Sequence, residues 1–360
     1  MESRISKLRI LLKEQNLDAA LISSVPNIFY LSGYEGFSTE ERDAFVIVTQ
    51  TGAYVITNAL YYHAVKEQIT HMQVLEYKRN NPFRKILETI CKEDNVKKLG
   101  FENHNLTVFE FSRIEEVAIS FIPVDLEKFR HRKTSEEITA IRTACALGDQ
   151  AFAYICTQLE EGMTEKQLAK KLELFIRNHN ADISFRAVVA FGKNAAVPHH
   201  FSGDDKLEKN DCVLMDFGVK LDNYCSDMTR TVFFGKPTAA DKRVYETARQ
   251  AQQEAVKYIE SCLEKNDFPI PESVDQTARS YVTDHGYPPF NHSSHGIGLE
   301  VHEYPHMSSE QQPMENGLVF SIEPGIYLPG NMGVRIEDLF TIQNNKLIQL
   351  TKTPKTLKII

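Results

Sequence analysis

Residues 212–234, CVLMDFGVKLDNYCSDMTRTVFF, decide the fold of this chain together with residues 290–305, FNHSSHGIGLEVHEYP, and residues 318–340, LVFSIEPGIYLPGNMGVRIEDLF. Acidic residues and histidines recur here inside short apolar or glycine-rich segments, where solvation alone would not place them. Four carboxylates and one imidazole stand out as a set: Asp216, Asp227, His295, Glu323 and Glu337. We interpret this set as a dinuclear metal site.

Apolar neighbours predict that two of the acids are buried. Residues 213–215 precede Asp216 and residues 319–322 precede Glu323, so both acids are expected in core strands. A lone buried carboxylate takes up a proton more readily than it keeps its charge. Two divalent cations carry four positive charges, which four carboxylates balance. Charge balance therefore favours two metal ions over one.

The spacing of the acids fits two β-hairpins. Residues 216–227 can fold as a hairpin around 220–223, and a two-residue turn there places both aspartates on one face. Glu323 and Glu337 flank a second possible hairpin, whose loop 329–331 lies midway between them. Each hairpin would then supply one acid from each strand.

His295 is the expected nitrogen ligand. It begins the sequence HGIG at 295–298, in which glycines let the backbone pass close to a packed site. An oxygen-rich ligand set with one imidazole suits Mn²⁺, Co²⁺ or Fe²⁺. It can also bind Zn²⁺, but it selects zinc less sharply than a thiolate site does. We favour manganese or cobalt.

Separated pieces of these stretches resemble the creatinase, prolidase and aminopeptidase P superfamily. The pieces are VLMDFG at 213–218, YCSDMTRT at 224–231, HGIGLEVHE at 295–303, SIEPGIY at 321–327 and GVRIED at 333–338. The resemblance extends over nearly the whole chain. It implies an α+β protein whose C-terminal catalytic domain has the pita-bread fold, and peptidases of this superfamily use two metal ions.

The same resemblance implies roles for further side chains. It assigns the histidine that reaches the scissile bond to His199, although the residues alone leave His200 as an alternative. His302 matches a second histidine that faces the substrate, and Glu323 is the candidate general base that later protonates the leaving nitrogen. The positions that resemble substrate contacts of the superfamily are Phe185, Val188, Val301 and Arg335. The first three resemble a proline pocket, and the arginine resembles one that supports the metal-site network.

The activity implied is hydrolysis of Xaa-Pro bonds, whose nitrogen carries no hydrogen and whose proline ring fixes the local shape. Two departures from the superfamily pattern bear on the substrate. Asn291 and Ser294 replace a usual histidine and glycine, and His292 is displaced by one position. His306 stands where several relatives carry an arginine that binds the carboxylate of a dipeptide.

Loss of that fixed positive charge places aminopeptidase P activity ahead of prolidase activity. The phrase KTPKTL at 352–357 also looks more like aminopeptidase P. An alternative of another class is a non-catalytic module that binds peptides or protein partners in the same pocket. The partners expected of the enzyme are proline-containing peptides, and the resemblance suggests a homodimer.

Apolar runs at 19–22, 44–48 and 53–56 predict a smaller mixed α/β unit, which resembles the superfamily's non-catalytic N-terminal domain. The charged run 127–133 predicts a solvated connector. We therefore expect an N-terminal domain over 1–123, a linker over 124–133 and a catalytic domain over 134–360. Capping boxes at 134–137, TSEE, and 164–167, TEKQ, predict the first two helices of the catalytic domain.

Bulk composition predicts a soluble globular protein. The chain has 360 residues, 42% of them hydrophobic, and a net charge of −8 dispersed along its length, which argues against a nucleic-acid partner. No segment approaches the roughly 20 apolar residues of a membrane helix, and the N-terminus lacks the apolar core of a signal peptide. We therefore expect no membrane partner and a cytoplasmic location. The six cysteines show no CxxC spacing, so neither a zinc finger nor a disulfide framework is expected.

Overall fold

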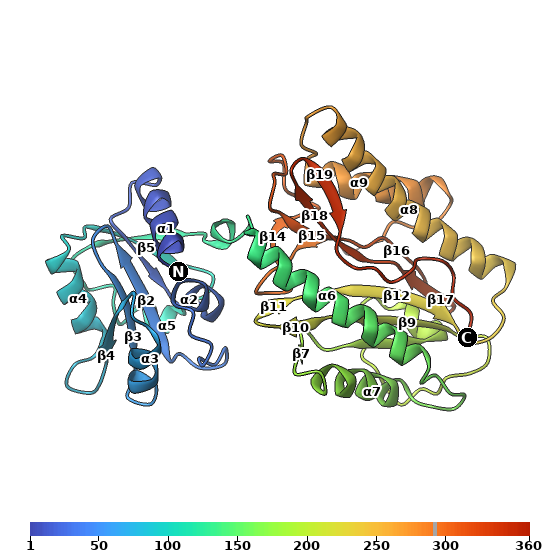
Figure 1. Ribbon diagram of the computed structural model, residues 1–360, viewed down its shortest axis with the longest axis horizontal. Coiled ribbons are helices and arrows are strands. Elements are labelled where there is room, and N and C mark those ends of the chain that lie inside the picture. Colours follow the sequence, from blue (N-terminus) through green and yellow to red (C-terminus); the bar gives the residue numbers. More distant parts are fainter. Residues whose placement is uncertain (291–293) are drawn as a thin grey trace. The chain divides into compact units, whose positions relative to one another are not determined.

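The computed structural model describes residues 1–290 and 294–360, so Asn291 and His292 lie outside the described residues. The chain divides into two compact units, Met1–Phe129 and Arg130–Ile360 (Figure 1). Among the described residues, no helix combines the length and the apolar character that crossing a bilayer requires.

The N-terminal unit is a mixed sheet with short helices, as predicted. Its strands lie in the order β4-β3-β2-β1-β5-β6, with β1 antiparallel to β2 and parallel to β5. The strand bounds are β1 Ala19–Ile22, β2 Ala44–Thr49, β3 Ala53–Thr57, β4 Gln73–Glu76, β5 Lys98–Glu102 and β6 Ser120–Val124. The helix bounds are α1 Glu2–Glu14, α2 Val25–Ser32, α3 Tyr62–Gln68, α4 Phe83–Glu93 and α5 Val108–Phe111, followed by the 3-10 turn η1 Glu127–Phe129.

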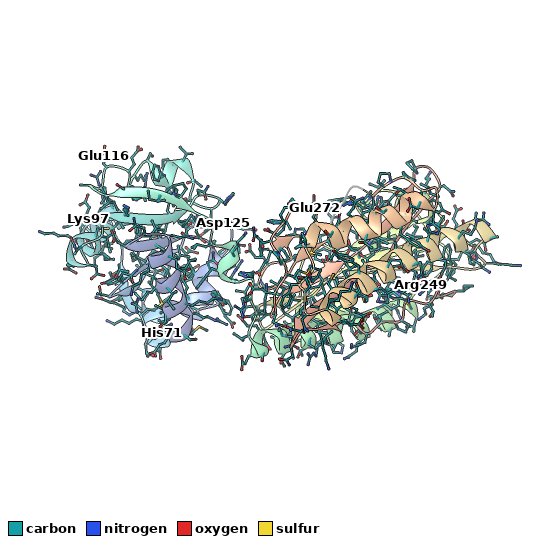
Figure 2. The ribbon with its side chains drawn as sticks, turned by 90° about the horizontal axis from the view of Figure 1, so that it is seen from above. His71, Lys97, Glu116, Asp125, Arg249 and Glu272 are labelled. Atoms are coloured by element: carbon teal, nitrogen blue, oxygen red, sulfur yellow. The ribbon has the colours of Figure 1, made fainter. Side chains whose placement is uncertain are left out.

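Several charged side chains of this unit are exposed. Lys97, Glu116 and Asp125 project from it in Figure 2. His71 lies 3.1 Å from the carbonyl oxygen of Leu31 through its Nε2, a structural contact inside the unit. Nothing in this arrangement indicates a catalytic constellation among the described residues of the unit.

The prediction that residues 127–133 form a solvated connector is wrong for two basic residues, Arg130 and Lys133. Arg130 and Lys133 are buried in the second unit, where Arg130 Nη2 lies 2.5 Å from Glu300 Oε2 and Lys133 Nζ lies 2.9 Å from Glu303 Oε2. The charged run is therefore part of the packed interior at these positions, because the buried carboxylate of Glu303, which lies close to both cations, offsets their desolvation.

Both predicted capping boxes form. Thr134 opens α6 Ser135–Cys156 and Thr164 opens α7 Glu165–Arg177, each with reciprocal side-chain and backbone hydrogen bonds. These helices pack on the antiparallel sheet β12-β9-β8 through a buried apolar cluster. The strand bounds on this side are β7 Asp182–Ile183, β8 Val188–Phe191, β9 Cys212–Phe217, β10 Val219–Leu221, β11 Tyr224–Cys225 and β12 Met228–Phe233, with the 3-10 turn η2 at Gly192–Ala196.

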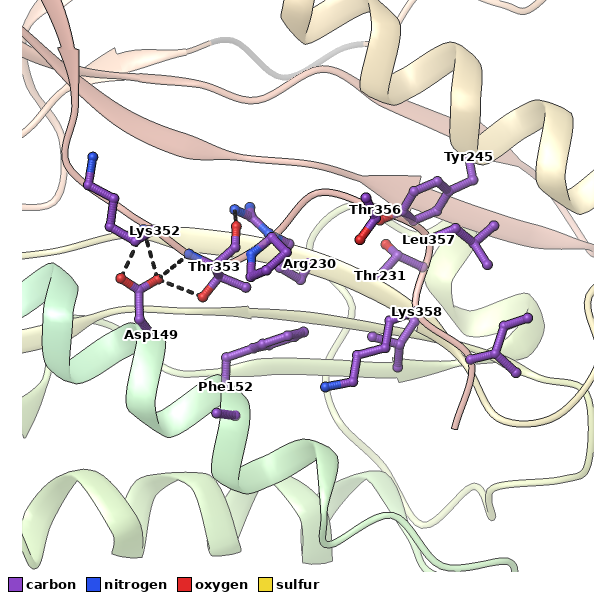
Figure 3. A pocket seen from close by; sticks show the side chains of 14 residues that line it. Asp149, Phe152, Arg230, Thr231, Tyr245, Lys352, Thr353, Thr356, Leu357 and Lys358 are labelled. Atoms are coloured by element: carbon purple, nitrogen blue, oxygen red, sulfur yellow. Dashed lines mark hydrogen bonds between the residues drawn. The ribbon is translucent and has the colours of Figure 1, made fainter.

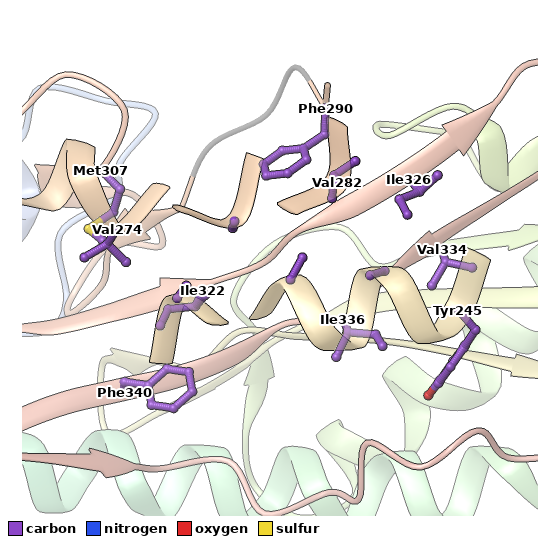
Figure 4. Packing of buried hydrophobic residues seen from close by; sticks show 14 of the residues in the cluster. Tyr245, Val274, Val282, Phe290, Met307, Ile322, Ile326, Val334, Ile336 and Phe340 are labelled. Carbon is purple, nitrogen blue, oxygen red and sulfur yellow. The ribbon is translucent and has the colours of Figure 1, made fainter. Parts of the chain in front are cut away.

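A second pair of helices covers the remaining strands. Helices α8 Ala239–Glu264 and α9 Pro271–Asp284 pack on them, and Figure 4 shows Tyr245 of α8 and Val274 of α9 in the buried apolar cluster that also contains Val334 and Phe340. The strand bounds here are β13 His295–Gly296, β14 Glu303–His306, β15 Val319–Ile322, β16 Gly325–Leu328, β17 Met332–Arg335, β18 Asp338–Gln343 and β19 Lys346–Gln349. In Figure 1, strands lie between α6 and α7 on one side and α8 and α9 on the other. The α+β architecture is as predicted.

Both predicted hairpins form. Leu221 pairs with Tyr224 across a two-residue turn, Asp222-Asn223, whose φ values are 48° and 66°. Leu328 pairs with Met332 across the loop 329–331. These are the conformations that Asp, Asn and Gly adopt most easily in tight turns.

The C-terminal segment is tied back onto α6. Asp149 accepts hydrogen bonds from the backbone N–H groups of Lys352 and Thr353 and from the Thr353 hydroxyl, as Figure 3 shows. The Thr353 carbonyl accepts a hydrogen bond from Arg230 at 2.7 Å. The end of the chain therefore braces β12, the strand that follows Asp227.

Candidate metal centre

The five candidate ligands come from positions far apart in the chain. Asp216 lies in β9, opposite Val188 and Thr229, and His295 begins β13. The other three acids lie in gaps between strands: Asp227 before β12, Glu323 after β15 and Glu337 before β18. The predictions that Glu323 lies inside a strand and that each hairpin strand supplies one acid are therefore wrong. A strand fixes alternate side-chain directions, whereas a gap lets a side chain turn toward a common point.

These side chains converge on one cavity of about 610 Å³. One possible ligand atom from each of Asp227, His295 and Glu337 lies within 4.8 Å of the other two. His295 Nε2 lies 3.6 Å from Asp227 Oδ2 and 3.4 Å from Glu323 Oε1. Asp216 lines the same cavity and forms an ion pair with Arg335.

The ionisation of this cluster shows that its negative charge is under-compensated. Burial and the charge of Glu337 raise the pKa of Asp227 well above its ordinary value. Burial and the same neighbour raise the pKa of Glu323, and burial with Asp216 raises that of Glu337 to about 8. Burial and nearby His302 lower the pKa of His295 to about 4, which leaves the imidazole neutral. Carboxylates that resist ionisation beside a neutral imidazole fit bound cations, which would reverse these shifts.

Two orphaned oxygens support the same conclusion. Asp227 Oδ1 and Glu337 Oε1 are buried and have no hydrogen-bond partner among the described residues. Buried carboxylate oxygens are normally satisfied by a donor or a cation. The residues present therefore fit divalent metal ions.

Hydrogen bonds from neighbouring side chains position two of the acids, Asp216 and Glu337. Thr229 Oγ1 donates to Glu337 Oε2 at 2.7 Å and accepts from Arg335 Nε at 2.9 Å. Arg335 also donates to the Tyr327 hydroxyl at 2.7 Å and to Asp216. One buried arginine therefore connects two of the acids, as expected for a residue that supports the metal-site network.

One departure from the superfamily pattern lies within this support. Ser294, where a glycine is usual, accepts a hydrogen bond from the Glu323 backbone N–H at 3.2 Å. Ser321 donates to Glu323 Oε1 at 2.8 Å and accepts from the His295 backbone N–H at 3.0 Å. Ser294 thus adds a hydrogen bond to the backbone of Glu323, the candidate general base.

The three other histidines considered for catalysis, His199, His200 and His302, lie in different surroundings. His302 lies beside His295, with ring centroids 4.3 Å apart, and burial together with His199 lowers its pKa. His199 is exposed and lines the cavity. His200 instead lies 2.7 Å from the buried Glu165 through its Nε2, which favours a structural role for it.

An apolar wall completes the cavity. Phe185, Val188 and Val301, the positions that resemble a proline pocket, all line it together with His306. The structure therefore brings together every candidate ligand, both candidate catalytic histidines and all the candidate substrate contacts. Their roles stay predictions.

Sequence reasoning missed Gln252 of α8. Its Nε2 donates to the carbonyls of Ile322 at 2.9 Å and Ile336 at 3.3 Å, each the residue just before a candidate glutamate ligand. It also lies 3.1 Å from Asp338 Oδ2. The sequence offered one signal for this residue: the polar amide of Gln252 lies on a face of α8 that otherwise carries alanines, namely Ala248, Ala251 and Ala255.

Comparison with known proteins agrees with this geometry. Residues 139–344 match Metallopeptidase family M24, and residues 4–131 match the Creatinase/Prolidase N-terminal domain. The chain belongs to metallopeptidase family M24. This M24 protein is therefore a hydrolase, and membership implies divalent metal ions at its site.

Individual relatives align with nearly all of this M24 chain. A Pyrococcus horikoshii protein named Xaa-Pro dipeptidase is 31% identical over 99% of both chains. The structure of an Xaa-Pro dipeptidase from Bacillus anthracis superposes with a TM-score of 0.92 at 31% identity, over 100% of this chain and 99% of that one. An X-Pro aminopeptidase from Thermotoga maritima gives a TM-score of 0.84 at 30% identity, over 96% and 98%.

Proposed function

We propose that this M24 protein is an Xaa-Pro dipeptidase. The observation that carries the proposal is a single cavity that combines four acids, four imidazoles and an apolar wall. Relatives named Xaa-Pro dipeptidase match over nearly the whole chain and support the dipeptidase ahead of the aminopeptidase. This reverses the order drawn from the sequence, which rested on His306 and on the phrase KTPKTL at 352–357. The aminopeptidase stays the second candidate because of the Thermotoga maritima neighbour.

The candidate ligands are those named from the sequence: Asp216, Asp227, His295, Glu323 and Glu337. We propose two divalent ions, with Mn²⁺ first and Co²⁺, Fe²⁺ or Zn²⁺ as alternatives, since the donors are mostly oxygen. Such ions, when bound, supply Lewis-acid activation of water and of the scissile carbonyl near neutral pH.

The protein's own groups then move protons and stabilise charge. Glu323 accepts a proton from the attacking water and delivers it to the proline nitrogen as the peptide bond breaks. His302, neutral because burial and His199 lower its pKa, donates a hydrogen bond to the carbonyl oxygen as that oxygen becomes negative. His199 donates from the exposed side. Phe185, Val188 and Val301 hold the proline ring and exclude water around it.

The test is a matched pair of substrates. Protein stripped of metal and reloaded with one ion at a time is given Ala-Pro and Ala-Pro-Ala. Metal-dependent cleavage of Ala-Pro with little cleavage of the tripeptide supports the dipeptidase. Preferential release of alanine from the tripeptide supports the aminopeptidase, and cleavage of neither by metal-loaded protein overturns the enzymatic proposal in favour of a peptide-binding module. Light scattering tests the homodimer that we also propose.

A further inference from the structure

Two arginines line the cavity, and they differ in the hydrogen bonds that they already make within the described part of the chain. Arg335 is buried and already donates to Asp216, Thr229 and Tyr327. Arg186 is exposed, and within the described part of the chain it forms no hydrogen bond or ion pair. Arg186 therefore keeps its donors available to a ligand in this cavity.

The side chain of Arg186 is nevertheless held in place. Its Cζ lies 3.2 Å from the centroid of the Phe201 ring, a stacked cation–π contact. Phe201 is 68% exposed, so packing inside the protein does not account for its aromatic side chain. Stacking on the flat face of a guanidinium leaves the N–H groups at its edge pointing outward.

The backbone below this pair is anchored. Ser202, next to Phe201, accepts a hydrogen bond from the Val189 N–H at 2.8 Å and donates to the Val189 carbonyl at 3.0 Å. Val189 belongs to β8, the strand that begins with the wall residue Val188. The stacked pair and the apolar wall therefore share one rigid support.

The position of Arg186 matches the chemistry of the proposed substrate. It lies in the chain between Phe185 and Val188, two residues of the wall that receives the proline ring. In an Xaa-Pro dipeptide the free carboxylate is attached directly to that ring. A carboxylate entering a site rich in acids needs a cation beside it, and a guanidinium fork binds a carboxylate through two parallel hydrogen bonds.

We propose that Arg186, stacked on Phe201, binds the C-terminal carboxylate of the dipeptide and so selects dipeptides over longer peptides. This inference rests on the proposed function. In a longer peptide a neutral amide replaces the carboxylate, and the charge-assisted pair is lost. Arg186 thereby supplies the fixed positive charge that His306 does not.

The experiment compares Arg186→Gln and Arg186→Lys with the unmodified metal-loaded enzyme on Ala-Pro and on Ala-Pro amide, which lacks only the carboxylate charge. For Arg186→Gln we expect KM for Ala-Pro to rise about tenfold to a hundredfold, as for loss of one partner of a charged hydrogen-bonded pair, with kcat nearly unchanged. KM for the amide should not change. Arg186→Lys should be intermediate, because it keeps the charge and loses the fork.

The matched control is Arg177→Gln, which changes the net charge equally. Arg177 pairs at the surface with Asp182, at 2.8 Å, and is not among the residues that line the cavity. Equal effects of Arg186→Gln on both substrates, or equal effects of the two Gln variants on Ala-Pro, would overturn the inference. A carboxylate preference that His306→Ala removes and Arg186→Gln leaves intact would also overturn it.

Calorimetric binding of Ala-Pro and of free proline separates this inference from the proposed function. If the unmodified protein binds these ligands without cleaving them, the proposed function fails. The inference on carboxylate recognition still stands if Arg186→Gln weakens both ligands and leaves prolinamide unaffected, and it falls if their affinities do not change.

Discussion

Lys133 Nζ lies 2.9 Å from Glu303 Oε2, with both side chains only 2% exposed. Arg130 adds a second cation, 3.2 Å from Glu303 Oε1. The same carboxylate accepts the backbone N–H groups of Leu299 at 2.9 Å and Glu300 at 3.1 Å. Residues that begin the second unit thus close the loop that presents His302 to the cavity.

Removal of one partner of this buried pair is expected to be costly. Burial opposes ionisation of Glu303, but Lys133 and Arg130 outweigh it and lower the pKa of the carboxyl. Lys133→Met should lower the free energy of unfolding by about 3–5 kcal/mol and reduce kcat, because the charge of Glu303 loses a buried partner. Urea unfolding and steady-state kinetics measure the two effects.

The control in the same segment is Arg132→Gln. Arg132 is 57% exposed and lies 3.1 Å from Glu315, so its loss should change stability by about 1 kcal/mol or less. The lowered pKa of Glu303 also sets how its contribution to folding stability depends on pH. That contribution is present above the pKa of the carboxyl in the unfolded chain, and it is lost as the pH falls through the pKa of the carboxyl in the folded protein. A Lys133→Met protein as stable as Arg132→Gln at neutral pH would contradict this account.

Asp227→Asn tests the metal centre. The substitution keeps the shape and removes the charge, so we expect at least one equivalent of metal to be lost and activity to fall more than about 100-fold. The metal-free variant should be at least as stable as the metal-free parent, since the carboxylate that it removes is buried among other acids. Elemental analysis, thermal unfolding and turnover measure these effects. Asp222→Asn, in the exposed hairpin turn, should change none of them, and wild-type metal content in Asp227→Asn would refute the ligand role.

The metal-free protein should lose stability as the pH rises. The pKa of Glu337 is raised to about 8 by burial and the charge of Asp216, so folding favours its protonated form. The stabilisation is complete below the ordinary carboxyl pKa and is lost as the pH rises toward 8. Thermal unfolding of chelated protein from pH 5 to pH 8.5 measures this trend. Added Mn²⁺ should reverse it, and a metal-free protein that is more stable at pH 8.5 than at pH 5 would disprove it.

Gln252→Leu tests the amide beneath the two glutamates. It removes the hydrogen bonds to Ile322 and Ile336 that fix the backbone just before Glu323 and Glu337. We expect a loss of about 1–3 kcal/mol in stability and about 10–100-fold in metal affinity. Metal titration and urea unfolding measure these losses. Gln253→Leu, one residue further along α8 and exposed, is the control, and equal metal affinity in the two variants would exclude a positioning role for Gln252.

From the sequence alone came the α+β class, the two capping boxes, both hairpin turns and the five candidate ligands. The α+β class followed from the resemblance of separated motifs to the superfamily. The other features depend on local chemistry: a Thr three residues before Glu or Gln, an Asp-Asn turn, or a ligand-type side chain beside a buried or glycine-rich run. Such signals are complete within a few residues. They can therefore be read without knowledge of the fold.

Only the tertiary structure decided how distant segments meet. It placed Asp227, Glu323 and Glu337 in gaps between strands, brought Gln252 of α8 beneath two of them, and buried Lys133 where a solvated connector was expected. It also placed Arg186 on Phe201 beside the apolar wall. Each of these relationships depends on contacts between residues far apart in the chain, and their energies come from burial and charge in three dimensions, which local patterns do not contain.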